Sequence, residues 1–343
     1  MAENVMEQIV AELRTSATKF YPQYTELRNV RIVGHTPKAD HFIYDIVMDF
    51  SDGSERIAAK VYRNKGGVEQ ARSKAKQESS NLNMVHKVAQ KKKLTGVPRP
   101  LGDFTELGAV VAEKLSGLPL QSIIMKAALL PGFSNGDGLA EVARHTGAWL
   151  RSFHRATSDM SSPFEPDRLI SELEQVCALC RKEGLEEADV RSIMTGARHA
   201  LHRGKKTLAA SAVLNDFTPL NVIVTEGGVG ISEFSRMSQR GTSFQDVAMF
   251  MASIEALEKY PFCNRTITSA IQKSFLEAYG VSASDQAVLR VLKMKALLSM
   301  FAQGRGIKES AVRKKVMWAT VMKRFIQQAA QRSLSQPETA HVA

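Results

Sequence analysis

Two runs rich in β-branched and aromatic residues stand out in the first quarter of the chain. HFIYDIVMDF covers residues 41–50 and ERIAAKVYR covers residues 55–63, and the turn-forming SDGS at 51–54 separates them. This pattern predicts a β-hairpin. Lys60 falls within the second strand among apolar residues, so its ammonium must either point to solvent or meet an anion.

A stretch of good helix formers follows the hairpin and predicts a helix over residues 68–89. Glu78 and Leu82 are four positions apart and therefore lie on one face of this helix. Glu78 is a candidate partner for Lys60, and such a pair can hold the lysine on the α and β phosphates of a nucleotide.

A second predicted hairpin carries polar residues at its open end. The β-branched runs VIV and VGI within residues 222–231 flank the turn TEGG, while Asp216, Asn221 and Glu233 lie on either side. Asp216 could accept a proton from a hydroxyl, and Asn221 with Glu233 could hold a divalent metal, which is the arrangement that phosphoryl transfer requires. The alternative is that Asp216 and Asn221 only cap a loop.

Breaks in these patterns divide the chain into four parts. Residues 1–27 are expected to form a leading helical segment, and residues 28–113 a small, strand-rich lobe with one long helix. The segment LSGLPL follows as a hinge. Residues 114–330 are mainly helical in pattern, and the polar residues 331–343 are expected to be a disordered tail.

These segments, in this order, resemble the aminoglycoside phosphotransferase and choline kinase-like branch of the protein-kinase-like fold. AAKVYR and KQESSNLNMV are similar to the strand and helix that carry the phosphate-binding lysine and its glutamate, here Lys60 and Glu78. LNDFTPLNVIV and ISEF are similar to the catalytic loop and the second metal motif. The resemblance implies an α+β, two-lobed fold, ATP with Mg²⁺ or Mn²⁺, Asp216 as base, and Asn221 and Glu233 as metal ligands.

Further nucleotide contacts follow from the same resemblance. GVPRPLGDF and VVAEKLSGLPL are similar to the lead-in and the linker, where the backbone of Ala112, Glu113 and Leu115 would meet the adenine edge. RIVGHTPKADHF stands where a glycine-rich phosphate loop belongs. It has a single glycine, and the expected phosphate contacts there are the backbone amides of three consecutive residues: Gly34, His35 and Thr36.

The chain departs from the family pattern at the catalytic loop and at the metal motif. Leu214 and Asn215 stand where the family usually has histidine and glycine, and Glu233 stands where it usually has aspartate. The extra methylene of Glu233 moves the carboxylate, which matters for a near-octahedral Mg²⁺ and less for Mn²⁺. These departures leave a second hypothesis open: a catalytically silent kinase-like module that binds an anionic partner through a basic surface.

Net charge bears on the phosphate acceptor. The chain has 46 Lys and Arg against 35 Asp and Glu, a formal net charge of +11. Such an excess repels polycations, so an aminoglycoside is not the expected acceptor. A hydroxyl-bearing, anionic acceptor such as a glycan or glycolipid precursor fits better. Nucleic acid is not expected, because the basic runs contain few aromatic residues and no RNA-binding signature.

The C-terminal basic region has two interpretations. Trp318, Val321, Met322 and Phe325 share one helical face, with basic residues elsewhere around the helix. The helix either packs on the larger lobe or meets an anionic lipid surface. No long apolar run or signal peptide is evident and cysteines are few, so we expect a cytoplasmic protein, peripheral to the inner membrane face if this helix meets lipid.

Overall fold

The structure is a computed structural model, and two compact units make up the chain. It describes residues 2–129, 136–159, 161–163, 165–202, 207–259, 263–304 and 312–335. The first unit combines Met1–Leu118 with Asn221–Ser238, and the second combines Pro119–Leu220 with Gln239–Ala343. The first division falls near the expected hinge. The return of residues 221–238 to the first unit differs from the expected continuous lobe 114–330.

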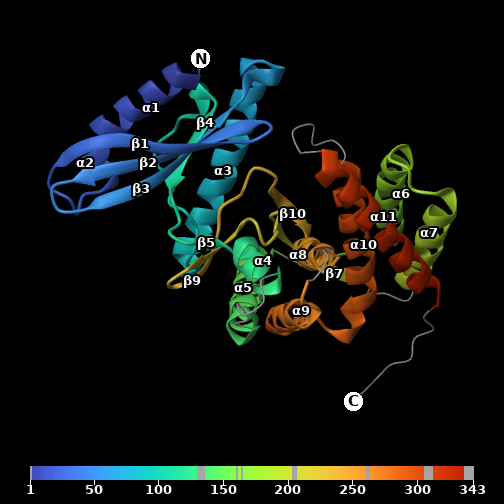
Figure 1. Cartoon of the computed structure of the whole chain (residues 1–343). Helices are drawn as coiled ribbons and strands as arrows, with labels where there is room; N and C mark the ends of the chain where they lie inside the picture. Colours follow the sequence, from blue (N-terminus) through green and yellow to red (C-terminus); the bar gives the residue numbers. More distant parts are fainter. Residues whose placement is uncertain are drawn as a thin grey trace. The chain divides into compact units, whose positions relative to one another are not determined.

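An antiparallel four-stranded sheet forms the centre of the first unit (Figure 1). Its strands lie in the order β1 (Leu27–Pro37), β2 (His41–Phe50), β3 (Ser54–Tyr62) and β4 (Ala109–Glu113). The predicted hairpin is confirmed, because β2 pairs with β3 and the Phe50 N–H donates to the Gly53 carbonyl over 2.8 Å. Each strand places alternate side chains on opposite faces of this sheet.

Two N-terminal helices cover one face of the sheet. These are α1 (Ala2–Thr15) and α2 (Ala17–Phe20), as expected for the leading segment. Met6, Ile9 and Leu13 recur at helical spacing on α1 and are buried. They join an apolar core with sheet residues that include Ile46, Met48, Ile57, Ala59 and Val61.

A long helix, α3 (Val68–Lys92), packs against β3 and β4. It begins at the predicted residue and runs three positions past the predicted end, to a C-terminal cap at Lys93 with φ of 54°. Alternation along β3 places Ala59 and Val61 in the apolar core and Lys60 on the opposite face. Short 3-10 helices complete the connections: η1 (Asn64–Gly66) and η2 (Thr105–Leu107) in this unit, and η3 (Ala283–Asp285) in the second.

The second predicted hairpin is also confirmed, and its backbone attaches it to the rest of the first unit. β8 (Val222–Thr225) pairs with β9 (Gly228–Ile231), and β5 (Leu118–Pro119) extends this sheet. The Ile231 N–H donates to the Gly96 carbonyl over 2.9 Å. A Cβ atom at Gly96 would lie 2.1 Å from the Val229 carbonyl oxygen, and one at Gly117 would lie 2.1 Å from that of Val224. Only glycine permits such close approach.

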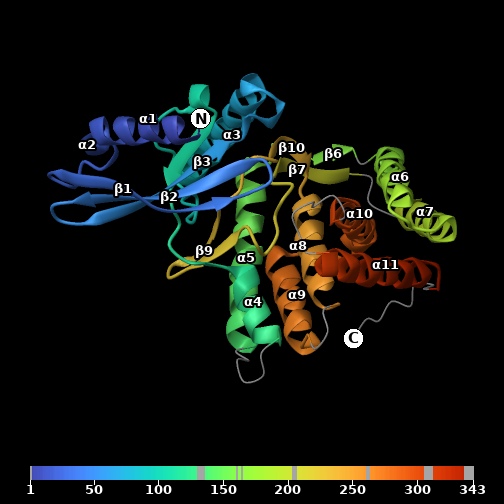
Figure 2. The same ribbon diagram turned by 45° about the horizontal axis from the view of Figure 1, so that its top comes forward.

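The second unit is mainly helical, as predicted (Figure 2). Its helices are α4 (Leu120–Leu129), α5 (Gly136–Thr157), α6 (Pro166–Lys182), α7 (Glu187–His202), α8 (Phe244–Leu257), α9 (Arg265–Tyr279), α10 (Gln286–Gly304) and α11 (Val312–Ser335). A small sheet has the strand order β10 (Ser238–Thr242), β7 (Thr207–Val213) and β6 (Ser161–Pro163). Helices α5 and α9 lie side by side, and aromatic rings fill the core beside them, with Phe250 and Phe275 centroids 4.2 Å apart.

The C-terminal helix α11 packs on the second unit. Met322 and Phe325 are buried, and Lys323 forms an ion pair of 3.1 Å with Glu186. The packed interpretation is therefore correct for this part of the helix, while the side chain of Trp318 lies outside the described residues. Residues 331–335 of the expected disordered tail continue α11, and residues 336–343 lie outside the described residues.

The described part of the chain contains no helix with the length and apolar composition needed to span a membrane.

Candidate active site

Lys60 lies between two carboxylates in the first unit. Its Nζ donates to Glu78 Oε1 over 2.7 Å and to both oxygens of Glu233 over 2.9 Å. The side chains of Lys60 and Glu78 are only 10% and 6% exposed. Of the two orientations open to Lys60, the structure therefore shows the one in which the ammonium meets anions. The expected Lys60 and Glu78 pair is present.

Tyr62 uses the second oxygen of Glu78. Its hydroxyl donates to Glu78 Oε2 over 2.5 Å, so both carboxylate oxygens of this buried residue are bonded. Sequence analysis missed Tyr62, although its position two residues after Lys60 on one strand places both side chains on one face. The tyrosine fixes the carboxylate that in turn fixes Lys60.

Helix α3 also holds the segment that carries Glu233. Asn81 Nδ2 donates to the carbonyls of Phe234 and Met237 over 3.0 and 3.2 Å. The Ser235 N–H donates to Glu233 Oε1 over 2.9 Å. Asn81 is itself buried, so this attachment is shielded from competing water. Glu233 is thereby fixed to the same helix that supplies Glu78.

One cation and two carboxylates share this buried cluster, and their pKa values shift accordingly. Burial acts to lower the pKa of Lys60, but the charges of Glu78 and Glu233 outweigh it and hold that pKa above its usual value. Burial raises the pKa of Glu78 despite the attraction of Lys60. Burial also opposes ionisation of Glu233, yet Lys60 and the Ser235 N–H keep its pKa below the usual range.

Asn221 and Glu233 lie at the open end of one hairpin. Val222 pairs with Ile231, and the Ser232 N–H donates to the Asn221 carbonyl over 3.1 Å. The described residues contain no group of three or more His, Cys, Asp and Glu side chains that could hold a metal. A phosphate-bound Mg²⁺ needs only one or two protein carboxylates or amides, since phosphates and water supply the rest. Asn221 and Glu233 supply one amide and one carboxylate, and their role as metal ligands stays a prediction.

The loop that carries Asp216 lies in the second unit and is held by a buried aspartate on α8. The N–H groups of Leu214 and Asn215 each donate to the Asp246 carboxylate over 2.8 Å. Asp246 also lies 3.0 Å from His154 Nε2, whose other ring nitrogen is 2.9 Å from the Tyr279 hydroxyl. Sequence analysis did not assign a role to Asp246, because these partners lie far apart along the chain.

Asn215 has a backbone conformation that explains its place before Asp216. Its φ is 61°, in the left-handed region that glycine and asparagine adopt most readily. Asn215 therefore meets a backbone requirement that most side chains resist. On the other side of Asp216, the fully buried Phe217 packs its ring against Trp149 and Phe275. The loop is thus fixed on both sides of the predicted base.

The expected phosphate loop at Gly34, His35 and Thr36 is wrong. All three residues lie in strand β1, paired with Asp45, Tyr44 and Ile43 of β2. Successive amides of an extended strand point in opposite directions, so they cannot converge on one phosphate. The turn between β1 and β2 instead lies at residues 38–40.

The expected adenine-binding backbone is partly occupied by the protein's own hydrogen bonds. The Glu113 N–H donates to the Arg99 carbonyl and the Lys114 N–H to the Arg56 carbonyl, each over 2.9 Å. Ala112 pairs with β3 and with the lead-in segment. A contact between adenine and Leu115, the next residue along, stays a prediction.

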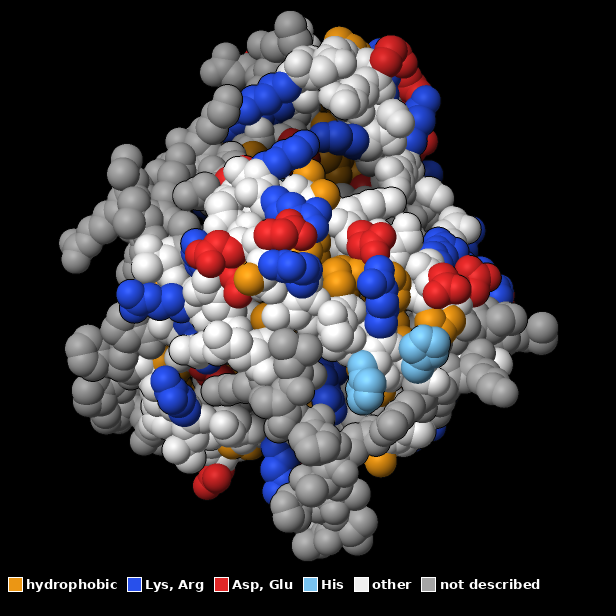
Figure 3. Space-filling view, turned by 90° about the vertical axis from the view of Figure 1, so that its right-hand side faces the viewer, with side chains coloured by type: hydrophobic (Ala, Val, Ile, Leu, Met, Phe, Trp, Pro, Cys, Tyr) orange, Lys and Arg blue, Asp and Glu red, His pale blue; other side chains and the backbone are white. Residues whose placement is uncertain are grey.

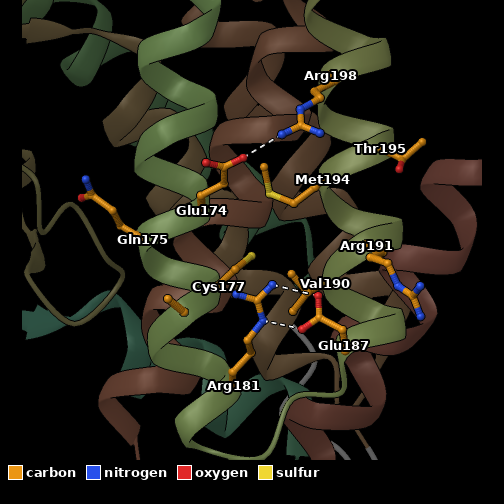
Figure 4. A pocket seen from close by; sticks show the side chains of 11 residues that line it. Glu174, Gln175, Cys177, Arg181, Glu187, Val190, Arg191, Met194, Thr195 and Arg198 are labelled. Atoms are coloured by element: carbon orange, nitrogen blue, oxygen red, sulfur yellow. Dashed lines mark hydrogen bonds and ion pairs between the residues drawn. The ribbon is translucent and has the colours of Figure 1, made fainter.

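A separate groove of about 610 Å³ lies between α6 and α7 of the second unit (Figure 4). Two ion pairs bridge it: Arg181 with Glu187, and Arg198 with Glu174, each at 2.7 Å. None of the predicted site residues lines this groove. It is therefore not the site that the motifs indicate.

Comparison with known proteins gives structural matches only. No protein-family model matches the sequence, and no curated protein matches it either. A spectinomycin phosphotransferase solved with ADP and spectinomycin is 11% identical, with a TM-score of 0.54 over 96% of this chain and 98% of that one. A thermostable mutant of an aminoglycoside phosphotransferase, solved with AMP-PNP and hygromycin B, is 14% identical, with a TM-score of 0.56 over 94% and 100%.

A choline/ethanolamine kinase family protein from Mesorhizobium loti is similar at the same level. It is 14% identical, with a TM-score of 0.52 over 97% of this chain and 96% of that one. Identities this low show the fold. The chain has the α+β, protein-kinase-like fold that its motifs predicted.

Proposed function

We propose that the protein is a kinase that transfers the γ-phosphoryl group of ATP to a hydroxyl of a small molecule or glycan. The observation that carries this proposal is the buried ion pair of Lys60 and Glu78 at 2.7 Å. It lies in a fold shared with phosphotransferases that were solved with ADP and AMP-PNP. Burying a lysine among carboxylates costs desolvation energy, and such buried ionisable clusters are frequent at functional sites.

Each residue has a distinct role in this proposal. Lys60, held by Glu78, would bind the α and β phosphates. Asn221 and Glu233 would hold a Mg²⁺ or Mn²⁺ ion, which supplies neutralisation of phosphate charge when bound. Asp216 would orient the acceptor hydroxyl and accept its proton. Both carboxylate oxygens of Glu233 accept from Lys60 Nζ in the structure. Glu233 would therefore have to release Lys60 before the lysine could bind phosphate.

The acceptor we propose is hydroxyl-bearing and anionic, and not a polycationic aminoglycoside. The support is the net charge of +11 and the exposed lysines at the end of α3: Lys87, Lys91, Lys92 and Lys93. On the face shown in Figure 3, by contrast, basic and acidic side chains are interspersed. A cytoplasmic location with peripheral contact to an anionic membrane face belongs to the same proposal, although the buried apolar face of α11 gives it no support.

The test is ATP turnover with pools of sugars, glycolipid precursors and choline-like alcohols. Asp216→Ala should lower kcat by about 100-fold or more, the usual contribution of general base catalysis. Asp167→Ala, at an exposed position on α6, is the matched control and should leave turnover unchanged. Equal turnover of wild type and Asp216→Ala would contradict the proposal. ATP binding with or without Mg²⁺ or Mn²⁺, but no turnover of any acceptor, would favour the silent module.

A further inference from the structure

His41 lies beside Lys60 on the face of the sheet that looks away from the apolar core. β2 begins at His41, which pairs with Tyr62, and Ile43 two residues later pairs with Lys60. Residues directly opposite each other in a ladder project to the same face. The imidazole therefore shares a face with Lys60, and its ring packs edge-on against Tyr62 at 5.8 Å between centroids.

One nitrogen of this imidazole has a partner and the other has none. Nδ1 lies 2.7 Å from Asp40 Oδ1, whereas Nε2 is buried without a hydrogen-bond partner in the described part of the chain. The side chain is 13% exposed. Leaving a buried polar atom unbonded is unfavourable, so a ligand that bonds Nε2 removes this cost.

The ring lies among groups that bind or repel anions. Asp40 from its own turn, Lys60 from β3 and Glu233 from the segment after β9 act on the ring electrostatically, and Tyr62 of β3 packs against it. Two residues of α3 contact these neighbours: Lys74 pairs with Asp40, and Glu78 accepts from Tyr62. Lys60 is the residue to which the proposed function assigns phosphate binding. The orphaned Nε2 of His41 shares that face.

We propose that Nε2 of His41 donates a hydrogen bond to a phosphate oxygen of the bound nucleotide. This inference rests on the proposed function. It also answers a question that the fold raises, because Gly34, His35 and Thr36 lie in a strand and cannot form a cradle of backbone amides. A side-chain donor at the start of β2 takes the place of that cradle.

The hydrogen-bonding pattern requires a protonated ring. Asp40 accepts from Nδ1–H, so Nε2 of a neutral imidazole carries only a lone pair and cannot donate to phosphate. Protonation makes both nitrogens donors. Burial and the charge of Lys60 lower the pKa of His41, which keeps the ring neutral without ligand. A phosphate anion at Nε2 reverses this balance, and nucleotide binding therefore takes up a proton.

The experiment compares the affinities of four proteins for ATP and for adenosine by titration calorimetry. His41→Leu should weaken ATP binding by about 10-fold or more, the value of a lost charge-assisted hydrogen bond, and leave adenosine binding unchanged. His41→Gln should recover part of the loss, because its amide keeps an N–H donor at similar reach. His35→Leu is the matched control, since β1 places that ring on the opposite face, and it should bind ATP as wild type does.

Each outcome decides between the two proposals. Equal ATP affinity in wild type and His41→Leu overturns the role of His41 and leaves the proposed function intact. Equal weakening of ATP and adenosine also overturns it, because the effect then does not involve phosphate. A wild-type protein that binds neither ATP nor adenosine, with or without Mg²⁺, overturns the proposed function and this inference together.

Discussion

Removing the charge of Lys60 should destabilise the first unit more than any other single change in the cluster. Lys60→Met keeps the length and apolar stem of the side chain but leaves Glu78 and Glu233 facing each other without a cation. These two side chains are only 6% and 16% exposed, so water compensates little for the loss. Stranding buried charge in this way typically costs about 3–5 kcal/mol.

The effect of a second substitution on the free energy of unfolding tests this reasoning, because its sign should differ between two backgrounds. In the wild-type background, Glu233→Gln should lower the free energy of unfolding by about 1–2 kcal/mol, since Lys60 loses a charged acceptor but keeps Glu78. In the Lys60→Met background, the same change removes one of two repelling carboxylates. It should then raise the free energy of unfolding by about 1–3 kcal/mol, the usual range of coupling between contacting groups.

Wild type, Lys60→Met, Glu233→Gln and the double variant can be compared by urea unfolding monitored by far-ultraviolet circular dichroism. Lys76→Met is the matched control: Lys76 also pairs with a glutamate, Glu106 at 2.7 Å, but its side chain is 58% exposed. This control should change the free energy of unfolding by no more than about 0.5 kcal/mol. If Glu233→Gln destabilises both backgrounds equally, Lys60 does not hold the two carboxylates together and the account of the cluster is refuted.

Two further predictions concern the catalytic loop and the response to pH. Asn215→Gly should keep turnover and the free energy of unfolding near wild type. Asn215→Val should lose about 1–2 kcal/mol of unfolding free energy and most turnover, because a β-branched residue resists φ of 61°. Denaturant unfolding and kcat measure these effects, and a fully active valine variant would contradict the prediction. The pKa of His41 is lowered on folding, so the unfolded chain binds the extra proton first as pH falls through about 6.5. Unfolding free energy should therefore fall more steeply below that pH in wild type than in His41→Gln, and identical profiles would count against a neutral, buried ring.

Local patterns predicted the elements that carry the site. The hairpin that places Lys60 in a strand, the helix that carries Glu78, and the hairpin between Asn221 and Glu233 all depend on neighbours within a few positions. Turn residues and side-chain periodicity determine such elements directly. Tyr62 was within reach of the same reasoning, because alternation in a strand places it beside Lys60.

Contacts between distant segments were not predictable in this way. Glu233 binds Lys60 across 173 positions of sequence, and no local pattern indicates that contact. The Leu214 amide and Asp246 are 32 positions apart and meet only because α8 packs beneath the loop. The prediction of a phosphate loop at Gly34 was wrong for another reason. The resemblance placed a loop at Gly34, whereas pairing with β2 stabilises an extended strand there, and nothing in that strand requires glycine.

The discontinuity of the first unit has a consequence for how the protein is made. Domains generally fold as units during synthesis, beginning with the N-terminal one. Here residues 119–220 are translated before the hairpin that completes the first unit. Until Glu233 leaves the ribosome, Lys60 has only Glu78 as a carboxylate partner, and Gly96 lacks the strand that packs against it. The first unit therefore lacks these contacts while much of the second unit is synthesised, and a chain that stops before residue 221 never gains them.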